Sequence, residues 1–323
     1  MTRRLFLACF AGAVSIASAF SHAQSFPDKP IRIIVPFAPG SGADGNSRYF
    51  AEKMAPMLGQ PVIVENKPGA DGAIGMSMAK AAPADGYTIV QGSISAVSVN
   101  TVVRKDLPYD PVNDFKPLFG YTRGMNVLLV PNDSKIKTLP DLIAAAKTSP
   151  KPLNMGTFSP TQHLSAAWLG SLLGLKFSNV PYKGQSQVQT DLIGNQLDFA
   201  FLDLGGASTL IRSGKLRPIA VTGEGRHPDF PEIPAAKETK GLESYAQYSW
   251  NAFYIRKEVP DAIHAKLADA VKRVMTSPET IEKFYKPKGA QGVAATSGEV
   301  RSMQLREIQA FQKVADFIGM KPE

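Results

Sequence analysis

The stretch "IRIIVPFAPGSGADGNSRYF", residues 31–50, decides how the chain begins to fold. Its apolar run "IRIIVPF" predicts a buried strand that leads through a glycine-rich loop into a helix. Gly40, Gly42 and Gly45 fit the spacing G-x-G-x-x-G, and Glu65 ends a second strand-like run, "PVIVE". This pattern is typical of a dinucleotide-binding βαβ unit, in which the acid binds a ribose.

Two details of the same region weigh against a dinucleotide. In that fingerprint the first glycine follows the strand directly, whereas here Pro36 and Pro39 intervene, fix the backbone and remove two N–H donors. Glu65 is followed by the turn sequence "NKPGADG", which alone explains an acid at a strand end. The glycines still allow a ligand to approach closely, and the helix N-terminus offers free N–H groups. A carboxylate satisfies such a site as well as a phosphate does.

Asp44 is an acid beside this predicted anion site, and two roles are open for it. It can cap the N-terminus of the helix, which we expect from about Asn46. It can also contact the ligand directly, if that ligand carries an amine or a protonated acid.

A second loop of the same kind occurs in "MGTFSPTQHL", residues 155–164. Ser159 is expected as the N-cap of a helix, with Pro160 at the first helical position and Gln162 completing a capping box. Capping alone explains these residues. Two helix N-termini, each following a strand, nevertheless suit the clamping of an anion between them.

The N-terminus predicts export. Residues 1–4 are basic, residues 5–20 are apolar, and "SHA" at 21–23 offers a cleavage site, so residues 1–23 read as a signal peptide. The sequence "TRRLFL" also fits a twin-arginine signal, and the Sec route stays open as well. We expect the mature protein in a periplasm, where NAD is scarce, and this disfavours a dinucleotide enzyme.

Composition narrows the class of protein further. About 300 mature residues exceed what one core usually serves, so two domains are expected. The net charge of +8 falls to +6 on cleavage, which suits an anionic small molecule or an anionic membrane surface. The cations are scattered, without a basic run, so we expect no nucleic-acid partner. Cys9 leaves with the signal peptide, which removes any disulfide or thiolate nucleophile.

Strand-like and helix-like segments alternate along most of the chain, which predicts βαβ units and parallel sheets. The pattern restarts after an irregular, proline-rich stretch, "LPYDPVNDFKPLF". We therefore expect an α/β fold of two lobes, comprising residues 24–124 plus 249–323 and residues 125–248. Two crossing strands near 120–128 and 246–256 would hinge them, with a ligand in the cleft between.

Few side chains in the mature chain carry catalytic or metal-binding chemistry. Its three histidines, His163, His227 and His264, lack metal-ligand spacing, and no G-x-S-x-G motif occurs. We expect no metal, no cofactor and no catalytic residue, although a triad that joins His163 to Asp203 stays open. Trp168 and Trp250 can either stack on an aromatic ligand or pack in the core.

Several motifs together resemble one known family. They are "PDKPIRIIVPFAPGSGADGNSR", "GQPVIVENKPGADGAIG", "ADGYTIV", "HLSAAWLG", "VPYKG" and "GKLRPIAVTGEGRHPDFPEIP". In this order they are similar to the Bug/TctC family, the periplasmic solute-binding proteins of tripartite tricarboxylate transporters. The resemblance implies a type II periplasmic-binding-protein fold and a small carboxylate as ligand. It also implies integral-membrane permease subunits as partners, and we expect a monomer.

The resemblance also implies where the ligand binds. The family holds a carboxylate with backbone groups and waters of two loops, which match residues 37–44 and 156–163. Side chains at strand ends that face the cleft would set specificity. The expected ligand-binding residues are Phe37, Ala38, Gly40, Ser41, Gly42, Asp44, Ser93, Ser95, Thr157, Ser159, Thr161, His163, Tyr182, Lys183 and Asp203. Lys183 is either a surface cation or an anchor for the ligand.

The chain departs from the family pattern in the glycine loop, in "FSPTQHL" and in "IPAAKETKGLESYAQYSWNAFY". These departures leave the ligand open among tricarboxylates, aliphatic dicarboxylates, acidic amino acids and aromatic acids such as terephthalate or nicotinate. Two other functions stay open: a ligand-presenting partner of a membrane sensor, and an exported hydrolase.

Overall fold

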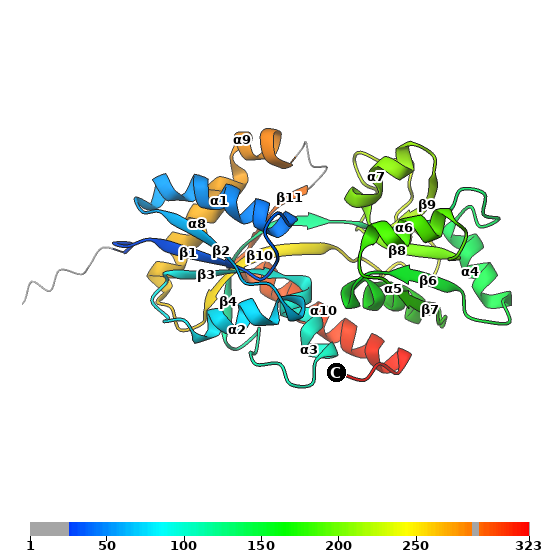
Figure 1. Cartoon of the computed structure of the whole chain (residues 1–323), viewed down its shortest axis with the longest axis horizontal. Coiled ribbons are helices and arrows are strands. Elements are labelled where there is room, and N and C mark those ends of the chain that lie inside the picture. The colour runs from blue at the N-terminus through cyan, green and yellow to red at the C-terminus, as the bar shows by residue number, and fades with distance from the viewer. Residues whose placement is uncertain (1–25, 286–290, 323) are drawn as a thin grey trace, which may run out of the picture.

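The computed structural model of the chain describes residues 26–285 and 291–322. Two β-sheets, each flanked by helices, form two lobes that are joined by extended strands (Figure 1). The α/β fold with two hinged lobes is thus confirmed. The predicted signal peptide, residues 1–23, lies outside the described residues.

The sheet of lobe 1 has the strand order β11-β4-β10-β3-β1-β2. Helices α1 and α8 pack on one face, and α2, α3 and α10 pack on the other. The strands are β1 (Ile31–Val35), β2 (Val62–Asn66), β3 (Thr88–Ser93), β4 (Phe115–Gly124), β10 (Ser249–Arg256) and β11 (Gln291–Thr296). The helices are α1 (Gly42–Leu58), η1 (Ala70–Gly72), α2 (Ala73–Ala81), η2 (Ser95–Val99), α3 (Asn100–Val103), α8 (Asp261–Thr276), α9 (Pro278–Thr280), η4 (Ile281–Tyr285) and α10 (Ser297–Ile318).

The sheet of lobe 2 has the order β7-β6-β8-β5-β9. Its strands are β5 (Asn126–Pro131), β6 (Asn154–Thr157), β7 (Ser178–Pro181), β8 (Phe199–Asp203) and β9 (Leu216–Val221). Its helices are α4 (Leu139–Thr148), α5 (Pro160–Leu172), α6 (Gln185–Ile193), α7 (Leu204–Arg212) and η3 (Ala236–Glu238).

The run "IRIIV" forms a central strand because its side chains are buried on both faces of the sheet. Ile31, Ile33 and Val35 pack toward α1 and α8, whereas Ile34 packs toward α2 and α10. Apolar residues on both faces are what a parallel sheet covered by helices requires.

The strand directions place the predicted loops between the lobes. β10 runs antiparallel to both β3 and β4, so β1, β2 and β3 run in the same direction as β4. Their carboxyl ends therefore face lobe 2, into which β4 leads. In lobe 2, β5 runs antiparallel to β8, which is parallel to β6, and β6 is parallel to β7. The carboxyl ends of β6, β7 and β8 therefore face lobe 1.

The two crossing segments are fastened to lobe 2 by buried side chains. Asn126 Nδ2 donates to Gln247 Oε1 over 2.8 Å, and Thr222 Oγ1 donates to the Gln247 carbonyl over 2.7 Å. On the lobe 1 side, the Arg123 guanidinium lies 4.5 Å from the centre of the Tyr248 ring. Between these contacts lie residues 124 and 125, where β4 ends and β5 begins.

Helix α10 makes a third connection between the lobes, because it begins in lobe 1 and packs against α5 of lobe 2 (Figure 1). Leu164 and Ala167 of α5 share a buried cluster with Phe311 and Val314 of α10.

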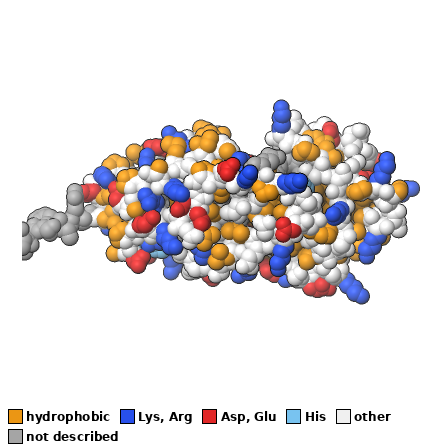
Figure 2. All heavy atoms as spheres, turned by 90° about the horizontal axis from the view of Figure 1, so that it is seen from below, with side chains coloured by type: hydrophobic (Ala, Val, Ile, Leu, Met, Phe, Trp, Pro, Cys, Tyr) orange, Lys and Arg blue, Asp and Glu red, His pale blue; other side chains and the backbone are white. Residues whose placement is uncertain are grey.

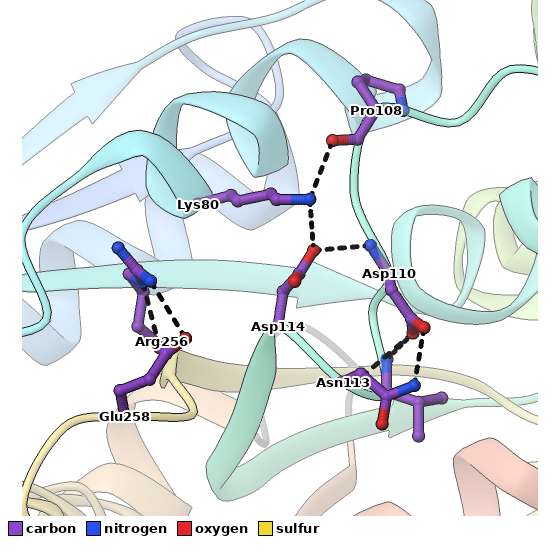
Figure 3. A network of polar contacts seen from close by, with 8 residues as sticks. Lys80, Pro108, Asp110, Asn113, Asp114, Arg256 and Glu258 are labelled. Carbon is purple, nitrogen blue, oxygen red and sulfur yellow. Dashed lines mark hydrogen bonds and ion pairs between the residues drawn. The ribbon is translucent and has the colours of Figure 1, made fainter.

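The irregular stretch before β4 has a defined structure (Figure 3). The Asp110 carboxylate accepts hydrogen bonds from Val112 N–H and Asn113 N–H, at 2.8 and 3.0 Å. Asp114 accepts from Asp110 N–H and pairs with Lys80 of α2 at 2.9 Å. Side-chain turns of this kind order a loop that propensity alone leaves undefined.

Two element boundaries and one additional strand differ from the expectation. α1 begins at Gly42 rather than near Asn46, because Ser41 caps it. β4 begins at Phe115, inside the stretch expected to be irregular. β11 was not expected at all, since "QGVAAT" lacks the large alternating side chains of a strand. The predicted lobe boundaries at 124/125 and 248/249 stay a prediction.

Two further features concern the helices and the charged surface. Within residues 26–285 and 291–322, no helix is long and apolar enough to cross a membrane. On the face shown in Figure 2, basic and acidic side chains lie interspersed over both lobes.

Candidate ligand-binding site

The first predicted loop joins β1 to α1 and is held by its own side chains. Ser41 is the N-cap of α1, and its hydroxyl accepts a hydrogen bond from Asp44 N–H over 3.2 Å. Asp44 occupies the third helical position, so its predicted role as N-cap is wrong. Its carboxylate instead reaches back and accepts from Gly40 N–H over 2.9 Å.

The Asp44 carboxylate is buried and has further donors. Asn66 Nδ2 donates to its Oδ1 over 2.9 Å, and Arg48 Nε lies 3.0 Å from the same oxygen. Burial raises the pKa of Asp44, but these hydrogen bonds outweigh burial and hold the pKa below its usual value. Asp44 is therefore a framework residue of the loop, and its contact with a ligand stays a prediction.

The second loop, between β6 and α5, has the same construction. Ser159 is the N-cap, and its hydroxyl accepts from Gln162 N–H over 3.3 Å, as the capping box predicts. The Gln162 side chain accepts from Phe158 N–H over 3.1 Å, one residue before the expected Ser159 N–H. In both loops, the serine hydroxyl accepts from the N–H of the third helical residue. The side chain of that third residue accepts from the N–H of the residue before the serine.

This construction leaves a set of backbone donors unused. Among the described residues, the N–H groups of Gly42, Ala43, Ser159 and Thr161 have no hydrogen-bond acceptor. Ala38, Gly40 and Gly42 are exposed, and Gly40 needs its glycine because its φ is +79°. Two helix N-termini, one in each lobe, therefore present free N–H groups at strand ends that face each other.

Two predicted residues, Ser93 and Asp203, lie at other strand ends that face the interlobe space, and a third, Ser95, begins η2 just after β3. Ser93 ends β3, and its hydroxyl lies 2.8 Å from that of Ser95. Asp203 ends β8 opposite Asn126 at the crossing into lobe 2. Burial raises the pKa of Asp203, although a hydrogen bond from Ser249 partly offsets this. Asp203 is thus a carboxyl group without a cationic partner among the described residues.

Tyr182 and Lys183 follow β7 and differ in their surroundings. The Tyr182 hydroxyl donates to Asp191 over 2.6 Å, and burial with this carboxylate raises the pKa of Tyr182 to about 12. Its hydroxyl is therefore already committed. Lys183 is exposed and, within the part of the chain described, its ammonium group has no partner. Contact of Tyr182 and Lys183 with a ligand stays a prediction.

A pocket of about 350 Å³ lies between the lobes beside the second loop. It brings together four of the predicted residues, all from lobe 2: Thr157, Ser159, His163 and Tyr182. Its opposite wall comes from η1 and α3 rather than from the first loop, and includes Asp71, Val103 and Arg104. Met320 and Lys321, beyond α10, complete the lining. The volume lies in the usual range for a small-molecule site.

Sequence reasoning missed Asp71, Arg104, Asn179 and Lys321 as pocket residues. Only Asp71 stood in a glycine-rich turn that could have drawn attention to it. Asn179 of β7 lies beside the second loop within lobe 2, where it accepts a hydrogen bond from Thr157 Oγ1 over 2.7 Å. Arg104 and Lys321 meet that loop only through packing of the lobes.

His163 lies between this pocket and an apolar one of about 390 Å³ under α10. Burial lowers its pKa, so the imidazole is neutral at pH 7. Asp203 is not among the causes of this shift. The two tryptophans pack in the protein: Trp168 lies edge-on to Tyr245 and Phe311, and Trp250 donates to the buried Glu307.

Comparison with known proteins places these features in one family. The family described as "Tripartite tricarboxylate transporter family receptor" matches residues 47–316. A UPF0065 protein of Bordetella pertussis (strain Tohama I) is 32% identical over 313 residues, which cover 96% of each chain.

Two solved structures from Rhodopseudomonas palustris share the fold. Rpa4515 with adipate is 28% identical, has a TM-score of 0.76, and is matched over 92% of this chain and 100% of its own. MatC with bound malate is 25% identical, has a TM-score of 0.71, and is matched over 90% of this chain and 99% of its own. The chain belongs to the TctC family of tripartite tricarboxylate transporter receptors.

Proposed function

We propose that this protein is a periplasmic solute-binding protein that captures a small carboxylate between its lobes. It would then deliver the ligand unchanged to the membrane permease of a tripartite tricarboxylate transporter. The observation that carries the proposal is the pair of helix N-termini, one per lobe, with unused N–H groups at facing strand ends. The relatives that were solved with adipate and malate support a carboxylate as the ligand class.

In the proposed mechanism, closure of the hinge follows from the ligand's contacts with both lobes. One carboxylate would accept hydrogen bonds from Gly42 and Ala43 in lobe 1 and from Ser159 and Thr161 in lobe 2, partly through waters. These contacts form together only when the lobes approach, so the ligand binds the closed state more tightly than the separated one. Residues 1–23 would direct the chain to the periplasm and be removed there.

A calorimetric and thermal-shift screen of residues 24–323 tests the proposal. The panel would contain adipate, malate, citrate, glutamate, nicotinate and terephthalate, with NAD and a neutral sugar as controls. A ligand at 100 times its Kd stabilises by roughly 2.7 kcal/mol, which visibly raises the melting temperature. Binding of a carboxylate that is recovered unchanged supports the proposal. Binding of NAD alone, or conversion of the ligand, contradicts it.

The transport role is tested separately in the host cell. Deletion of the coding gene should abolish uptake of the radiolabelled ligand, and the chain without residues 1–23 should not restore it. Normal uptake with loss of only a transcriptional response would favour a sensor partner instead.

A further inference from the structure

From the interlobe pocket we infer that Arg104 is a specificity-determining residue that receives the distal carboxylate of a short aliphatic dicarboxylate. The inference rests on the proposed function, because it takes the other carboxylate to be held at the second loop. It names the residue and the ligand class that the two loops by themselves leave open.

The charges around the pocket favour an anion on the lobe 1 side. The lobe 2 wall carries hydroxyl and amide groups with the neutral His163, and none of its lining side chains is a cation. The charged side chains that line the pocket are Arg104, Lys321 and Asp71, two cations against one anion. A second carboxylate in this pocket is therefore balanced only by groups opposite the second loop.

The Arg104 side chain is placed to bind and is only partly used. It follows α3, and its Nη2 lies 3.3 Å from Asp71 Oδ2, in an ion pair that is about a third to half exposed. Such pairs contribute little, so a ligand can replace this one. The Arg104 Nε is buried, so only the two Nη groups can reach a ligand, and within the described residues Nη2 alone has a partner, Asp71. Once Asp71 is replaced, the two Nη groups can hold a carboxylate with two parallel hydrogen bonds.

The wall between the two ends fits a hydrocarbon chain. Val103 and Met320 on one side and Phe158 and Pro160 on the other give the pocket apolar lining besides its polar groups. An aliphatic dicarboxylate matches such a lining, because its methylene groups need no hydrogen-bond partner. A citrate-like ligand would place a further carboxylate and a hydroxyl against this apolar wall.

A structural role for Arg104 has to be separated from a binding role. The Asp71 carbonyl already accepts from Asn100 Nδ2 over 3.1 Å, so η1 is attached to this part of lobe 1 without Arg104. If Arg104 only positioned η1, its loss would weaken all ligands alike. If it binds the distal acid, its loss would weaken only ligands that have one.

The test uses calorimetry with adipate and with hexanoate, which lacks the distal acid. The wild-type protein should bind adipate roughly ten- to a hundredfold more tightly than hexanoate, and Arg104→Gln should lose that preference while hexanoate binding is unchanged. The matched control is Lys105→Gln, which removes the same charge from the exposed neighbouring residue and should keep the preference. Asp71→Asn should tighten adipate binding several-fold, because it releases the guanidinium, and this gain should disappear when Arg104→Gln is added.

Each other outcome is informative. An equal loss for adipate and hexanoate in a folded Arg104→Gln protein overturns the inference and leaves the proposed function standing. A wild-type protein that binds citrate or an aromatic acid but not adipate does the same. A wild-type protein that binds no carboxylate overturns both.

Discussion

The buried carboxyl of Glu307 on α10 should make the stability of this protein fall as pH rises. Its side chain is 8% exposed, and the Trp250 indole N–H donates to both of its oxygens, at 2.9 and 2.8 Å. Ser98 of η2 donates more weakly, over 3.5 Å. Burial raises the pKa of Glu307 to about 8, although the hydrogen bonds from Trp250 and Ser98 and the charge of Arg306 oppose the rise.

The sign and size of the effect follow from this pKa. Below about pH 4.5 the carboxyl is protonated in both the folded and the unfolded chain, so it adds no pH dependence to stability there. Between about pH 4.5 and 8 the unfolded chain ionises while the folded one keeps its proton, so stability is lost progressively as pH rises. At about 1.4 kcal/mol per pH unit, the loss reaches at most about 5 kcal/mol at pH 8.

Glu307→Gln keeps the shape of the side chain and an acceptor for Trp250, but it cannot ionise. We expect the variant to match the wild type at pH 5 and to exceed it by several kcal/mol at pH 8, as measured by urea unfolding at each pH. Glu232→Gln, on the exposed surface, should leave the wild-type profile unchanged. Parallel pH profiles for the wild type and Glu307→Gln would refute the reasoning.

Three further perturbations test the loops and the hinge. Gly42→Val should fold normally, since an added Cβ meets no atom within 4 Å, but should weaken carboxylate binding at least about tenfold in calorimetry; unchanged affinity would contradict the loop assignment. Asp44→Ala should lower the free energy of unfolding by about 2–4 kcal/mol at pH 7, and by less as pH falls through the lowered pKa of Asp44. Urea unfolding at pH 7 and at pH 3 measures both losses. An equal loss at the two pH values would contradict a stabilising role for the ionised carboxylate. Asn126→Ala should cost about 1–3 kcal/mol, because it leaves Gln247 Oε1 buried without its donor; a denaturant midpoint equal to that of the wild type would show that the buried contact contributes nothing.

Most of the fold could be predicted because periodicity and turn residues are local signals. The strand "IRIIV" and the crossing at "YSWNAFYIR" were located from their apolar runs alone. β11 was not predicted, because its small side chains carry no such pattern and its only strand partner among the described residues is β4. The structure of the stretch before β4 was not predicted, because hydrogen bonds to the side chains of Asp110 and Asp114 define it.

The candidate site could be predicted only in part. The capping signature was recognised at Ser159, but the same spacing at Ser41 and Asp44 was obscured by the glycine fingerprint that overlaps it. The role of Arg104 had no local signal, because its neighbours in the pocket come from segments distant in sequence. Such sites depend on how the lobes pack, which no short window of sequence encodes.

The mirrored capping of the two loops has a consequence for binding kinetics. Because the side chains of Asp44 and Gln162 already hold the loop backbones in place, little ordering remains for the ligand to impose on them. Encounter rates should then differ little from one carboxylate to another. Discrimination should instead appear in the residence time, so the preferred ligand would be recognised in stopped-flow experiments by slow release rather than by fast capture.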